Sequence, residues 1–423
     1  MMARRMALAT SHLFPADSAI EDGRLVVGGC DAVALAREFG TPAYVLAERD
    51  LRERARVAVR ALAEHHDGPG EIVYASKALP CTAVLRLFAE EGLGCDVASG
   101  GELHLALRAG LHPARLYLHG NAKSDAELGE ALAAGVGTIV LDNPAEAERL
   151  EALVPAGRRQ RVLIRVTPGI DADTHAAILT GQAGSKFGMP PADAAAVASR
   201  PWERLEVEGL HVHIGSQLFA PEPWRRAAEA LAGLGRFGTY DLGGGLAVPY
   251  TREDPPTDLA AWVALMAEAA REAFDGGFRL VLEPGRALVA PAGLTLYTVQ
   301  AVKPGAAGES IVAVDGGMSD NLRPMLYGAS YEAALADRVG EDGESCQVVG
   351  KHCESGDVLV RDARLPAPRP GDVLAVPVTG AYGHAMANNY NGVPRPPVIM
   401  CAGGEARAVV RRETYEDLSA RDL

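Results

Sequence analysis

The stretch EIVYASKAL at residues 71–79 is the segment around which the rest of the chain is organised. Residues 72–75 form a short β-type run, Lys77 follows it, and a helical pattern begins near Pro80. A lysine at the end of a buried strand is expected to lose hydration, which is unfavourable for an ammonium group. A lysine that forms a Schiff base with a carbonyl avoids this cost. On this stretch alone, a salt-bridged or solvent-reaching lysine is the simpler interpretation, so other parts of the sequence must decide.

The composition is that of an ordinary globular protein. The 423 residues are 48% hydrophobic and 23% charged, which suffices for a large core. The length is typical of two or three domains, or of one large barrel with a smaller domain. The net charge of −14 argues against nucleic acid and anionic membrane surfaces as partners.

The cysteines and the apolar runs restrict the class further. The 6 cysteines are scattered without a CxxC pair, so neither a zinc site nor a disulfide framework is predicted. Arg4 and Arg5 precede an apolar run that is too short for a signal peptide. No apolar stretch approaches the roughly 20 residues that a membrane helix needs. We therefore expect a cytoplasmic protein with no membrane partner.

Between residues 71 and 283, β-type runs alternate regularly with helical patterns. The predicted strands are 71–76, 94–98, 115–118, 138–142, 161–166, 207–213, 239–242 and 279–283. Helical patterns between them include 101–109, 125–134, 144–153, 223–236 and 258–274. Such alternation predicts a parallel sheet, and eight units are the number that closes a (β/α)8 barrel. A doubly wound open sheet is the competing architecture.

After residue 284 the pattern changes to short β-type runs, many of them separated by Pro/Gly turns. These runs are 294–302, 310–314, 346–349, 357–360, 372–378, 398–400 and 406–410. They predict a mostly β domain. The chain is accordingly divided into a barrel domain at 43–290 and a C-terminal β domain at 291–423, preceded by a segment at 1–42.

Side chains with chemical function cluster at the C-terminal ends of the predicted strands, where the active sites of closed barrels lie. They are Lys77, Asp96, His119, Arg165, His211, His213, Gly243, Gly244, Gly245, Glu283 and Arg286. Taken singly, a histidine is more often a hydrogen-bonded core residue, a glycine run a flexible turn, and a glutamate an ion-pair partner. Their convergence on one mouth is hard to explain by packing.

His211 and His213 are two residues apart in a predicted strand, so they face the same side and are candidate metal ligands. No third ligand follows at a spacing typical of metal sites. We therefore expect no metal.

A lysine, an imidazole, a carboxylate and a glycine-rich turn together fit one cofactor, pyridoxal 5′-phosphate. Lys77 would bind the aldehyde of the cofactor, and the backbone N–H groups at residues 243–245 would bind its phosphate. Glu283 would keep the ring nitrogen protonated, which makes the ring an acceptor of electrons. His213 would cover the ring face.

The β domain contributes three further polar motifs. DGGMSDNLRPMLYGA at 315–329 contains Arg323 and Tyr327, and GKHCESGD at 350–357 contains Cys353 and Glu354. GAYGHAMANNYN at 380–391 contains Tyr382. Ordinary turn chemistry is the simpler explanation of the Asp–Gly and Ser–Gly pairs. Cys353 lies between two ionisable residues in a polar turn, which is less typical of a packing cysteine.

Six short motifs, in this order, resemble those of the fold-type III, alanine-racemase-like decarboxylases. They are YASK at 74–77, HIGSQ at 213–217, GGG at 243–245, EPGR at 283–286, CESGD at 353–357 and GAY at 380–382. The resemblance extends from about residue 40 nearly to the C-terminus. It is strongest to the branch of that family that acts on meso-2,6-diaminopimelate. Many members have Tyr-His where this chain has Ser330-Tyr331, which implies small differences in the pocket.

The resemblance implies a fold and an assembly. It implies a (β/α)8 barrel with a β domain that packs with the N-terminal segment 1–42, and a homodimer with shared active sites. The cofactor-binding residues that it implies are Lys77, Asp96, His213, Ser216, Gly243, Gly244, Gly245, Glu283, Gly285, Arg286 and Tyr382. The implied substrate-binding residues are Arg286, Arg323, Tyr327, Glu354 and Tyr382. Lys77, His213 and Cys353 would be catalytic, with Cys353 as proton donor.

The resemblance further implies decarboxylation of meso-2,6-diaminopimelate to L-lysine and CO2, the last step of lysine biosynthesis. An arginine suits a distal carboxylate and a glutamate suits a distal ammonium. Ornithine has no distal carboxylate, so Arg286 and Arg323 favour diaminopimelate, a small amino acid, as the substrate. Three alternatives remain. The chain could act on another amino acid or a carrier-bound acyl group in secondary metabolism, act as an isomerase, or be a non-catalytic regulator on the same scaffold.

Overall fold

The computed structural model describes residues 11–170, 185–305 and 308–423, so the Arg4–Arg5 segment lies outside the described residues. The chain forms two compact units. The barrel unit comprises Arg54–Ala247 and Thr257–Ala287, and the β unit comprises Met1–Glu53, Val248–Pro256 and Leu288–Leu423.

The barrel unit contains a closed barrel of eight parallel strands, which confirms the predicted (β/α)8 architecture and excludes the open sheet. The strands are β5 (Gly70–Ala75), β6 (Gly94–Val97), β7 (Leu116–Leu118), β8 (Thr138–Leu141), β9 (Gln160–Arg165), β10 (Leu205–His211), β11 (Thr239–Asp241) and β12 (Arg279–Leu282). The barrel closes where Leu280 of β12 pairs with Gly70 of β5. Parallel strands are buried on both faces, which accounts for their nearly continuous apolar sequences.

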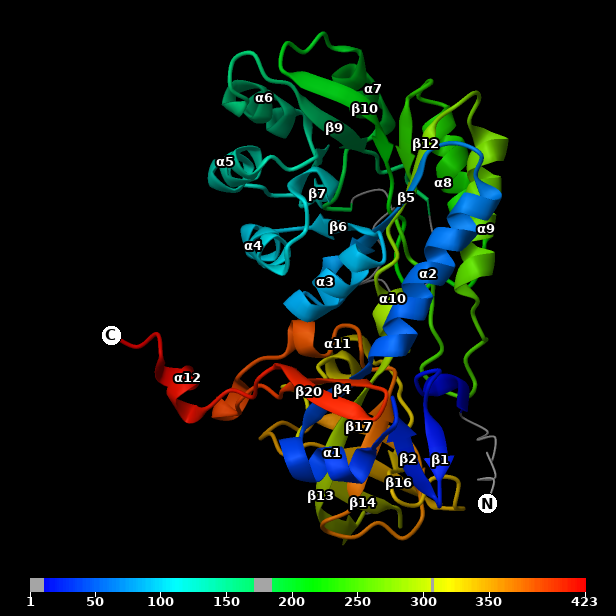
Figure 1. The fold of residues 1–423 in the computed structure, drawn as a ribbon, viewed down its shortest axis with the longest axis vertical. Coiled ribbons are helices and arrows are strands. Elements are labelled where there is room, and N and C mark those ends of the chain that lie inside the picture. Colours follow the sequence, from blue (N-terminus) through cyan, green and yellow to red (C-terminus); the bar gives the residue numbers. More distant parts are fainter. Residues whose placement is uncertain (1–10, 171–184, 306–307) are drawn as a thin grey trace. The chain divides into compact units, whose positions relative to one another are not determined.

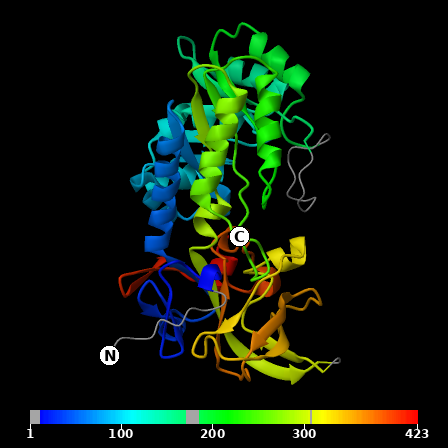
Figure 2. The ribbon, with the colours of Figure 1, turned by 90° about the vertical axis from the view of Figure 1, so that its right-hand side faces the viewer.

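Helices follow the strands on the outside of the barrel (Figure 1). They are α2 (Glu48–His65), α3 (Thr82–Glu90), α4 (Gly100–Ala109), α5 (Asp125–Ala134), α6 (Pro144–Leu153), α7 (Pro191–Ser199), α8 (Glu222–Ala232), α9 (Leu259–Ala273) and α10 (Arg286–Val289). Side-chain caps define where several of these helices begin. Ser124 and Glu127 form a capping box at the N-terminus of α5, and Asn143 caps the N-terminus of α6. Figure 2 shows α8 and α9 running side by side.

Helix α7 was not among the predicted helical segments. Its sequence PADAAAVAS is rich in small residues, and it buries only Ala194 and Val197. The apolar stripe is therefore too weak to reveal a helix through its period.

The β unit is built on a nine-stranded sheet with the path β17-β16-β14-β13-β4-β19-β20, to which β18 and β15 are added. These strands are β4 (Ala43–Ala47), β13 (Gly293–Pro304), β14 (Ser310–Val314), β15 (Ala334–Leu335), β16 (Glu344–Val349), β17 (Val358–Leu365), β18 (Val373–Pro377), β19 (Val398–Ala402) and β20 (Glu405–Val410). A small sheet of β1 (Ala19–Glu21), β2 (Arg24–Val27) and β3 (Cys30–Asp31) and the helices α1 (Ala32–Phe39), α11 (Arg323–Tyr327) and α12 (Tyr415–Ser419) complete it.

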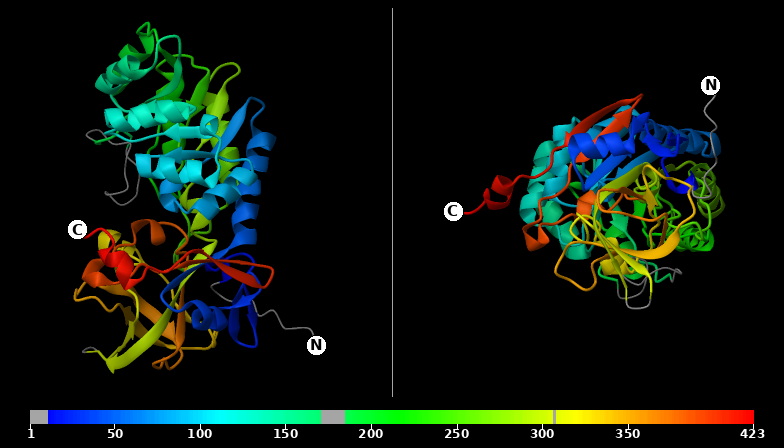
Figure 3. Two further views of the ribbon diagram at one scale, coloured as in Figure 1. Left: turned by 60° about the vertical axis from the view of Figure 1, so that its left-hand side comes forward. Right: turned by 90° about the horizontal axis from the view of Figure 1, so that it is seen from below.

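Strand β4 belongs to the β unit, whereas the predicted domain division placed residues 43 onward in the barrel domain. It lies inside the sheet of the β unit, antiparallel to β13 and parallel to β19 (Figure 3). All five of its residues are buried, as a strand with neighbours on both edges requires. The compact units accordingly divide after Glu53 rather than after residue 42.

No helix among the described residues is long and apolar enough to cross a membrane.

A buried ion pair between Lys123 and Glu146 lies beside strand β8 in the barrel unit. Nζ of Lys123 lies 2.7 Å from Oε1 of Glu146, and the two side chains are 2% and 0% exposed. The ammonium also donates to the carbonyl oxygens of Gly120 and Val140. Each charge therefore depends on the other for its stability in the interior.

We expect Lys123→Met to lower stability by about 3–5 kcal/mol, because it leaves the Glu146 carboxylate buried without a counter-charge. The double variant Lys123→Met/Glu146→Leu should recover most of the loss. Melting temperatures measure both effects. Arg200→Met, which breaks the exposed Arg200–Glu148 pair, is the matched control and should change little. Equal melting temperatures for the single and double variants would contradict the assigned role.

Candidate active site

Lys77 lies on a 3-10 turn, Ser76–Ala78, directly after β5. Ser76 and Ala78 are fully buried, but Lys77 is exposed. The expectation that its ammonium loses water at the end of the strand is therefore wrong for this structure. An exposed amine at this end of β5 is accessible to a carbonyl compound.

Glu283 directly follows β12 and is the centre of the buried polar group in the barrel unit. Its Oε1 lies 2.8 Å from Nε2 of His119, and its Oε2 lies 3.3 Å from Nε2 of His211. The two imidazole rings meet edge to face with centroids 4.9 Å apart. His119 follows β7 and His211 ends β10, so residues from two other strands hold the carboxylate that follows β12.

The electrostatic balance in this group favours ionisation of Glu283 over that of Asp241. Burial by itself raises the pKa of Glu283, but His119 and His211 lower it well below its usual value. Burial and the charge of Glu283 raise the pKa of Asp241 well above its usual value. Burial lowers the pKa of His211 to about 4. These shifts favour the ionised form of Glu283, the protonated form of Asp241 and the neutral form of His211.

Several buried atoms of the group make no well-aligned hydrogen bond within the described residues. They include Oε1 of Glu283, Nε2 of His119 and Oδ2 of Asp241. Buried polar atoms without partners are rare and indicate a ligand or an ordered water. A protonated ring nitrogen is a donor that could make a well-aligned hydrogen bond to Oε1 of Glu283.

The sequence placed His119 and His211 at strand ends, but it did not predict that they and Asp241 contact Glu283. Their shared contact with Glu283 depends on pairing across β7, β10, β11 and β12, which residue spacing does not reveal. The four residues also offer donor atoms within 4.8 Å of one another, a geometry open to a metal ion. His213, which the sequence offered with His211 as a candidate ligand, is not among these four residues. The absence of a metal stays a prediction.

His213 lies two residues beyond β10 and faces the glycine turn. The backbone N–H of Gly244 donates to its Nδ1 at 3.3 Å. Burial lowers the pKa of His213 well below its usual value, and the cations of Lys77 and Arg165 lower it further. The ring is therefore neutral, as an imidazole that covers a flat aromatic ligand should be.

The turn at Gly243, Gly244 and Gly245 accommodates no side chain. A Cβ at Gly244 would lie 2.2 Å from the carbonyl oxygen of Glu283. Gly243 and Gly245 have φ values of +66° and +108°, which favour glycine. The bare backbone at the end of a barrel strand therefore fits close approach of an anion such as phosphate.

Ser216 and Arg286 are brought together as predicted for neighbouring anion-binding groups. Nη2 and Nε of Arg286 lie 2.9 and 3.3 Å from Oγ of Ser216. Arg286 is buried at the start of α10, next to Gly285, where a Cβ would meet Cβ of Ala75 at 2.8 Å. The hydroxyl, the guanidinium and the glycine turn are the kind of group set that binds phosphate or carboxylate.

In the β unit, Cys353 and Glu354 are both exposed on the loop between β16 and β17. The backbone N–H of Cys353 donates to Oδ1 of Asn391 at 3.0 Å. The hydroxyl of Tyr390 donates to the Glu354 carboxylate. The segment 380–391 therefore holds the loop at 350–357 through these hydrogen bonds.

Asp357 fixes the base of the same loop. Its carboxylate accepts from Nδ1 of His352 at 2.8 Å and from the backbone N–H of His352 at 2.9 Å. It also accepts from the N–H of Met318 at 2.6 Å, in the motif at 315–329. Three motifs that the sequence singled out are thus connected by hydrogen bonds within one unit.

Arg323 begins α11 and is 5% exposed. Its Nη1 donates to the hydroxyl of Tyr331, a residue to which the sequence assigned only a possible difference in the pocket. Tyr327 ends the same short helix and is half-buried, and Tyr382 is half-buried with a φ of +59°.

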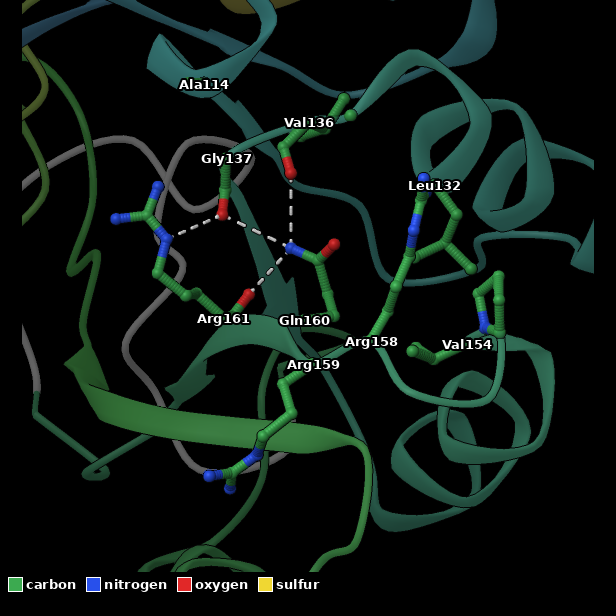
Figure 4. A pocket seen from close by; sticks show the side chains of 11 residues that line it. Ala114, Leu132, Val136, Gly137, Val154, Arg158, Arg159, Gln160 and Arg161 are labelled. Carbon is green, nitrogen blue, oxygen red and sulfur yellow. Dashed lines mark hydrogen bonds between the residues drawn. The ribbon is translucent and has the colours of Figure 1, made fainter.

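A pocket of about 330 Å³ lies elsewhere in the barrel unit, at the N-terminal ends of β8 and β9 (Figure 4). Arg158, Arg159 and Arg161 line it. Arg159 and Arg161 donate to the backbone carbonyls of Leu205 and Gly137, and in Figure 4 they extend away from Arg158. The pocket is at the opposite ends of the strands from Lys77 and Glu283, so it plays no part in their chemistry.

Comparison with known proteins gives concordant results. The pyridoxal binding domain of pyridoxal-dependent decarboxylases matches residues 48–290. Diaminopimelate decarboxylase of Actinosynnema pretiosum subsp. auranticum is 48% identical over 97% of this chain and 95% of its own length. The enzyme of that name from Bacillus subtilis is 44% identical, covering 95% and 96%. The crystal structure of diaminopimelate decarboxylase from M. jannaschii in complex with L-lysine superimposes with a TM-score of 0.90 at 31% identity, covering 99% of each chain.

The carboxyl group of Asp96 generates a prediction about pH. Burial and the charge of Glu283 raise the pKa of Asp96 to about 7 in the folded barrel, against 3.8 for an ordinary aspartate. Between these values the folded state holds a proton that the unfolded state has lost, so this group lowers stability as pH rises. In cofactor-free protein, Asp96→Asn should therefore gain stability relative to wild type from pH 4 to pH 7.

Melting temperatures of both proteins across this range measure the difference. Asp67→Asn, at an exposed position, is the control and should follow the wild-type curve. Parallel curves for Asp96→Asn and wild type would show that Asp96 is ionised throughout.

Proposed function

The chain belongs to the pyridoxal-dependent decarboxylases, and from this we propose that it converts meso-2,6-diaminopimelate to L-lysine and CO2. The observation that carries the proposal is Glu283, an ionised carboxylate held by His119 and His211 whose Oε1 makes no well-aligned hydrogen bond among the described residues. Pyridoxal phosphate bound there supplies a protonated ring that accepts the electrons of the breaking bond between the α-carbon and the carboxylate.

The residues of the barrel unit would hold the cofactor. The Lys77 amine would bind its aldehyde carbon until the substrate amine displaces it. Glu283 would keep the proton on the ring nitrogen, and Asp96 would lie in the same group of carboxylates. The neutral ring of His213 would cover one face. Gly243, Gly244, Gly245, Ser216, Gly285 and Arg286 would bind the phosphate through backbone N–H groups, a hydroxyl and a guanidinium.

Residues of the β unit would recognise the substrate. Arg323 would bind the carboxylate at the end of the substrate that does not react, with Tyr327 and Tyr382 as further contacts. Arg286 of the barrel unit is a further predicted contact of the substrate. Glu354 would bind the ammonium at that end. The thiol of Cys353 would deliver a proton to the carbon that has lost CO2.

The protein would act as a homodimer with shared active sites, Cys353 and Glu354 entering from the partner subunit. Their exposure in the single chain supports this arrangement. Met325 and Leu326 of α11 are also exposed, at 45% and 50%, and Met325 lies against Gly356 of the same loop. An exposed apolar pair beside a polar functional loop is typical of a surface that another subunit covers. The cytoplasmic location stays a prediction from the sequence.

Incubation of the cofactor-loaded protein with meso-2,6-diaminopimelate should release L-lysine and CO2 in equal amounts. Lys77→Ala should lower the rate by about three orders of magnitude, as is typical when a group that acts in the chemical step is lost. Lys303→Ala, at an exposed position on β13, is the control and should keep the wild-type rate.

Two outcomes would change the assignment. Turnover of ornithine, arginine or a glutamyl conjugate in place of diaminopimelate would indicate a related decarboxylase of secondary metabolism. Inversion of the substrate without release of CO2 would indicate an isomerase.

Mixing Lys77→Ala with Cys353→Ala should restore activity if active sites are shared between subunits. Random exchange of subunits produces mixed dimers in which one of the two sites is intact, so about a quarter of the wild-type activity should return. Turnover before and after mixing measures this, with each variant incubated alone as control. No recovery, despite subunit exchange seen by labelled protein, would place both residues in one subunit's site.

A further inference from the structure

We propose that Tyr331 and Tyr250 are positioning residues for Arg323, holding its guanidinium so that its free edge selects ligands that carry a carboxylate. The proposal rests on the proposed function, in which this carboxylate belongs to the unreacted end of diaminopimelate. All the contacts that support it lie within the β unit.

The two tyrosines enclose the arginine. The guanidinium carbon of Arg323 lies 4.3 Å from the ring centroid of Tyr250 and 5.6 Å from that of Tyr331. The two rings meet edge to face at 74° with centroids 5.1 Å apart. Tyr250 and Tyr331 are 5% and 4% exposed, so the contacts are shielded from water. A cation over an aromatic face is stabilised more strongly when it is desolvated.

Arg323 has no carboxylate partner among the residues that the structure describes. Its contacts there are the Tyr331 hydroxyl and the two rings. A buried charge is unfavourable unless an opposite charge accompanies it, and neutral phenols do not supply one. Arg323 is therefore a buried cation to which a ligand could supply the counter-charge that the described residues do not.

The contacts of the Arg323 guanidinium leave only its edge open to a ligand among the described residues. The Tyr250 ring occupies a face of the guanidinium plane, and the Tyr331 hydroxyl takes a donor at Nη1. The other N–H groups, including those of Nε and Nη2, lie in the plane at its edge. A planar carboxylate accepts two parallel hydrogen bonds from such an edge, whereas an ammonium or an alkyl chain cannot.

An ion pair between Arg252 and Glu332 connects the chain segments that carry the two tyrosines. Arg252, two residues after Tyr250, binds Glu332, the neighbour of Tyr331, with Nε–Oε1 and Nη2–Oε2 distances of 2.9 and 2.7 Å. The backbone N–H of Arg252 also donates to Glu332 at 3.2 Å. This clamp joins the 248–256 segment to the chain after α11, so Tyr250 and Tyr331 are held as one structure around Arg323.

The test compares two ligands of the cofactor-loaded protein. L-Lysine keeps the carboxylate of the unreacted end, and 1,5-diaminopentane is the same diamine without it. In wild type, L-lysine should bind more tightly. Tyr331→Phe should weaken L-lysine binding about tenfold, the effect of losing one hydrogen bond to a charged group, and change diaminopentane binding less than about twofold. The KM for diaminopimelate should rise by the same factor while kcat changes little.

Two further variants separate positioning from general loosening. Tyr331→His, whose ring nitrogen can accept from Nη1, should restore much of the L-lysine affinity. Tyr240→Phe removes a buried phenol that bonds only to backbone groups of the barrel unit, so it should leave the ligand preference unchanged. If Tyr331→Phe does not fold, Arg252→Gln tests the clamp and should weaken L-lysine binding selectively.

The outcomes are distinct. A wild-type preference for L-lysine that survives in Tyr331→Phe overturns the proposal and leaves the proposed function intact. An equal loss in Tyr240→Phe overturns it as well. Wild-type protein that releases no lysine from diaminopimelate and binds both ligands equally overturns the proposed function and the proposal with it.

Discussion

The pairing of β12 with β5 is the constraint on which the barrel unit depends. Three residue pairs join these strands, beginning with Leu280 and Gly70, and convert a row of parallel strands into a closed ring. Closure places the chain after β5, with Lys77, next to the chain after β12, with Glu283. It also directs His119, His213 and the glycine turn to the same end. An open sheet would have placed the first and last of these residues at opposite edges.

The buried charges at this end form a single balanced system. Asp96, Asp241 and Glu283 are close enough that ionisation of one raises the pKa of the others, so one negative charge is favoured. His119 and His211 fix that charge on Glu283. Arg165, buried nearby, faces the same carboxylates. The position of the charge is therefore set by geometry before any ligand binds, which is the arrangement expected of a preorganised site.

Local patterns in the sequence were sufficient to predict most of the helices and strands. The segments 125–134, 144–153 and 310–314 match α5, α6 and β14 to the residue, because caps, turns and apolar runs mark their ends. β4 could be recognised as a strand, but its membership in a sheet with β13 and β19 depends on partners that are about 250 and 350 residues away in the chain. No local pattern carries that information.

For the candidate site the same distinction holds. Strand-end positions and motifs identified Lys77, His213, Glu283 and Cys353. The roles of Asp241 and His211 around Glu283, and of Tyr250 and Tyr331 around Arg323, arise only when distant segments meet. Even at Lys77 the sequence misjudged the environment, since the side chain is exposed rather than buried.

The β unit is made of segments that are far apart in the chain, and this affects synthesis of the protein. Its first strands are made early, but β4 finds its partners only when β13 and then β19 have left the ribosome. The entire barrel is translated between β4 and β13. The nascent chain therefore carries an apolar strand with both edges unpaired for most of its elongation, a period in which such edges are prone to aggregation. Chaperone binding to the first 50 or so residues would protect the chain until the last sheet partner emerges.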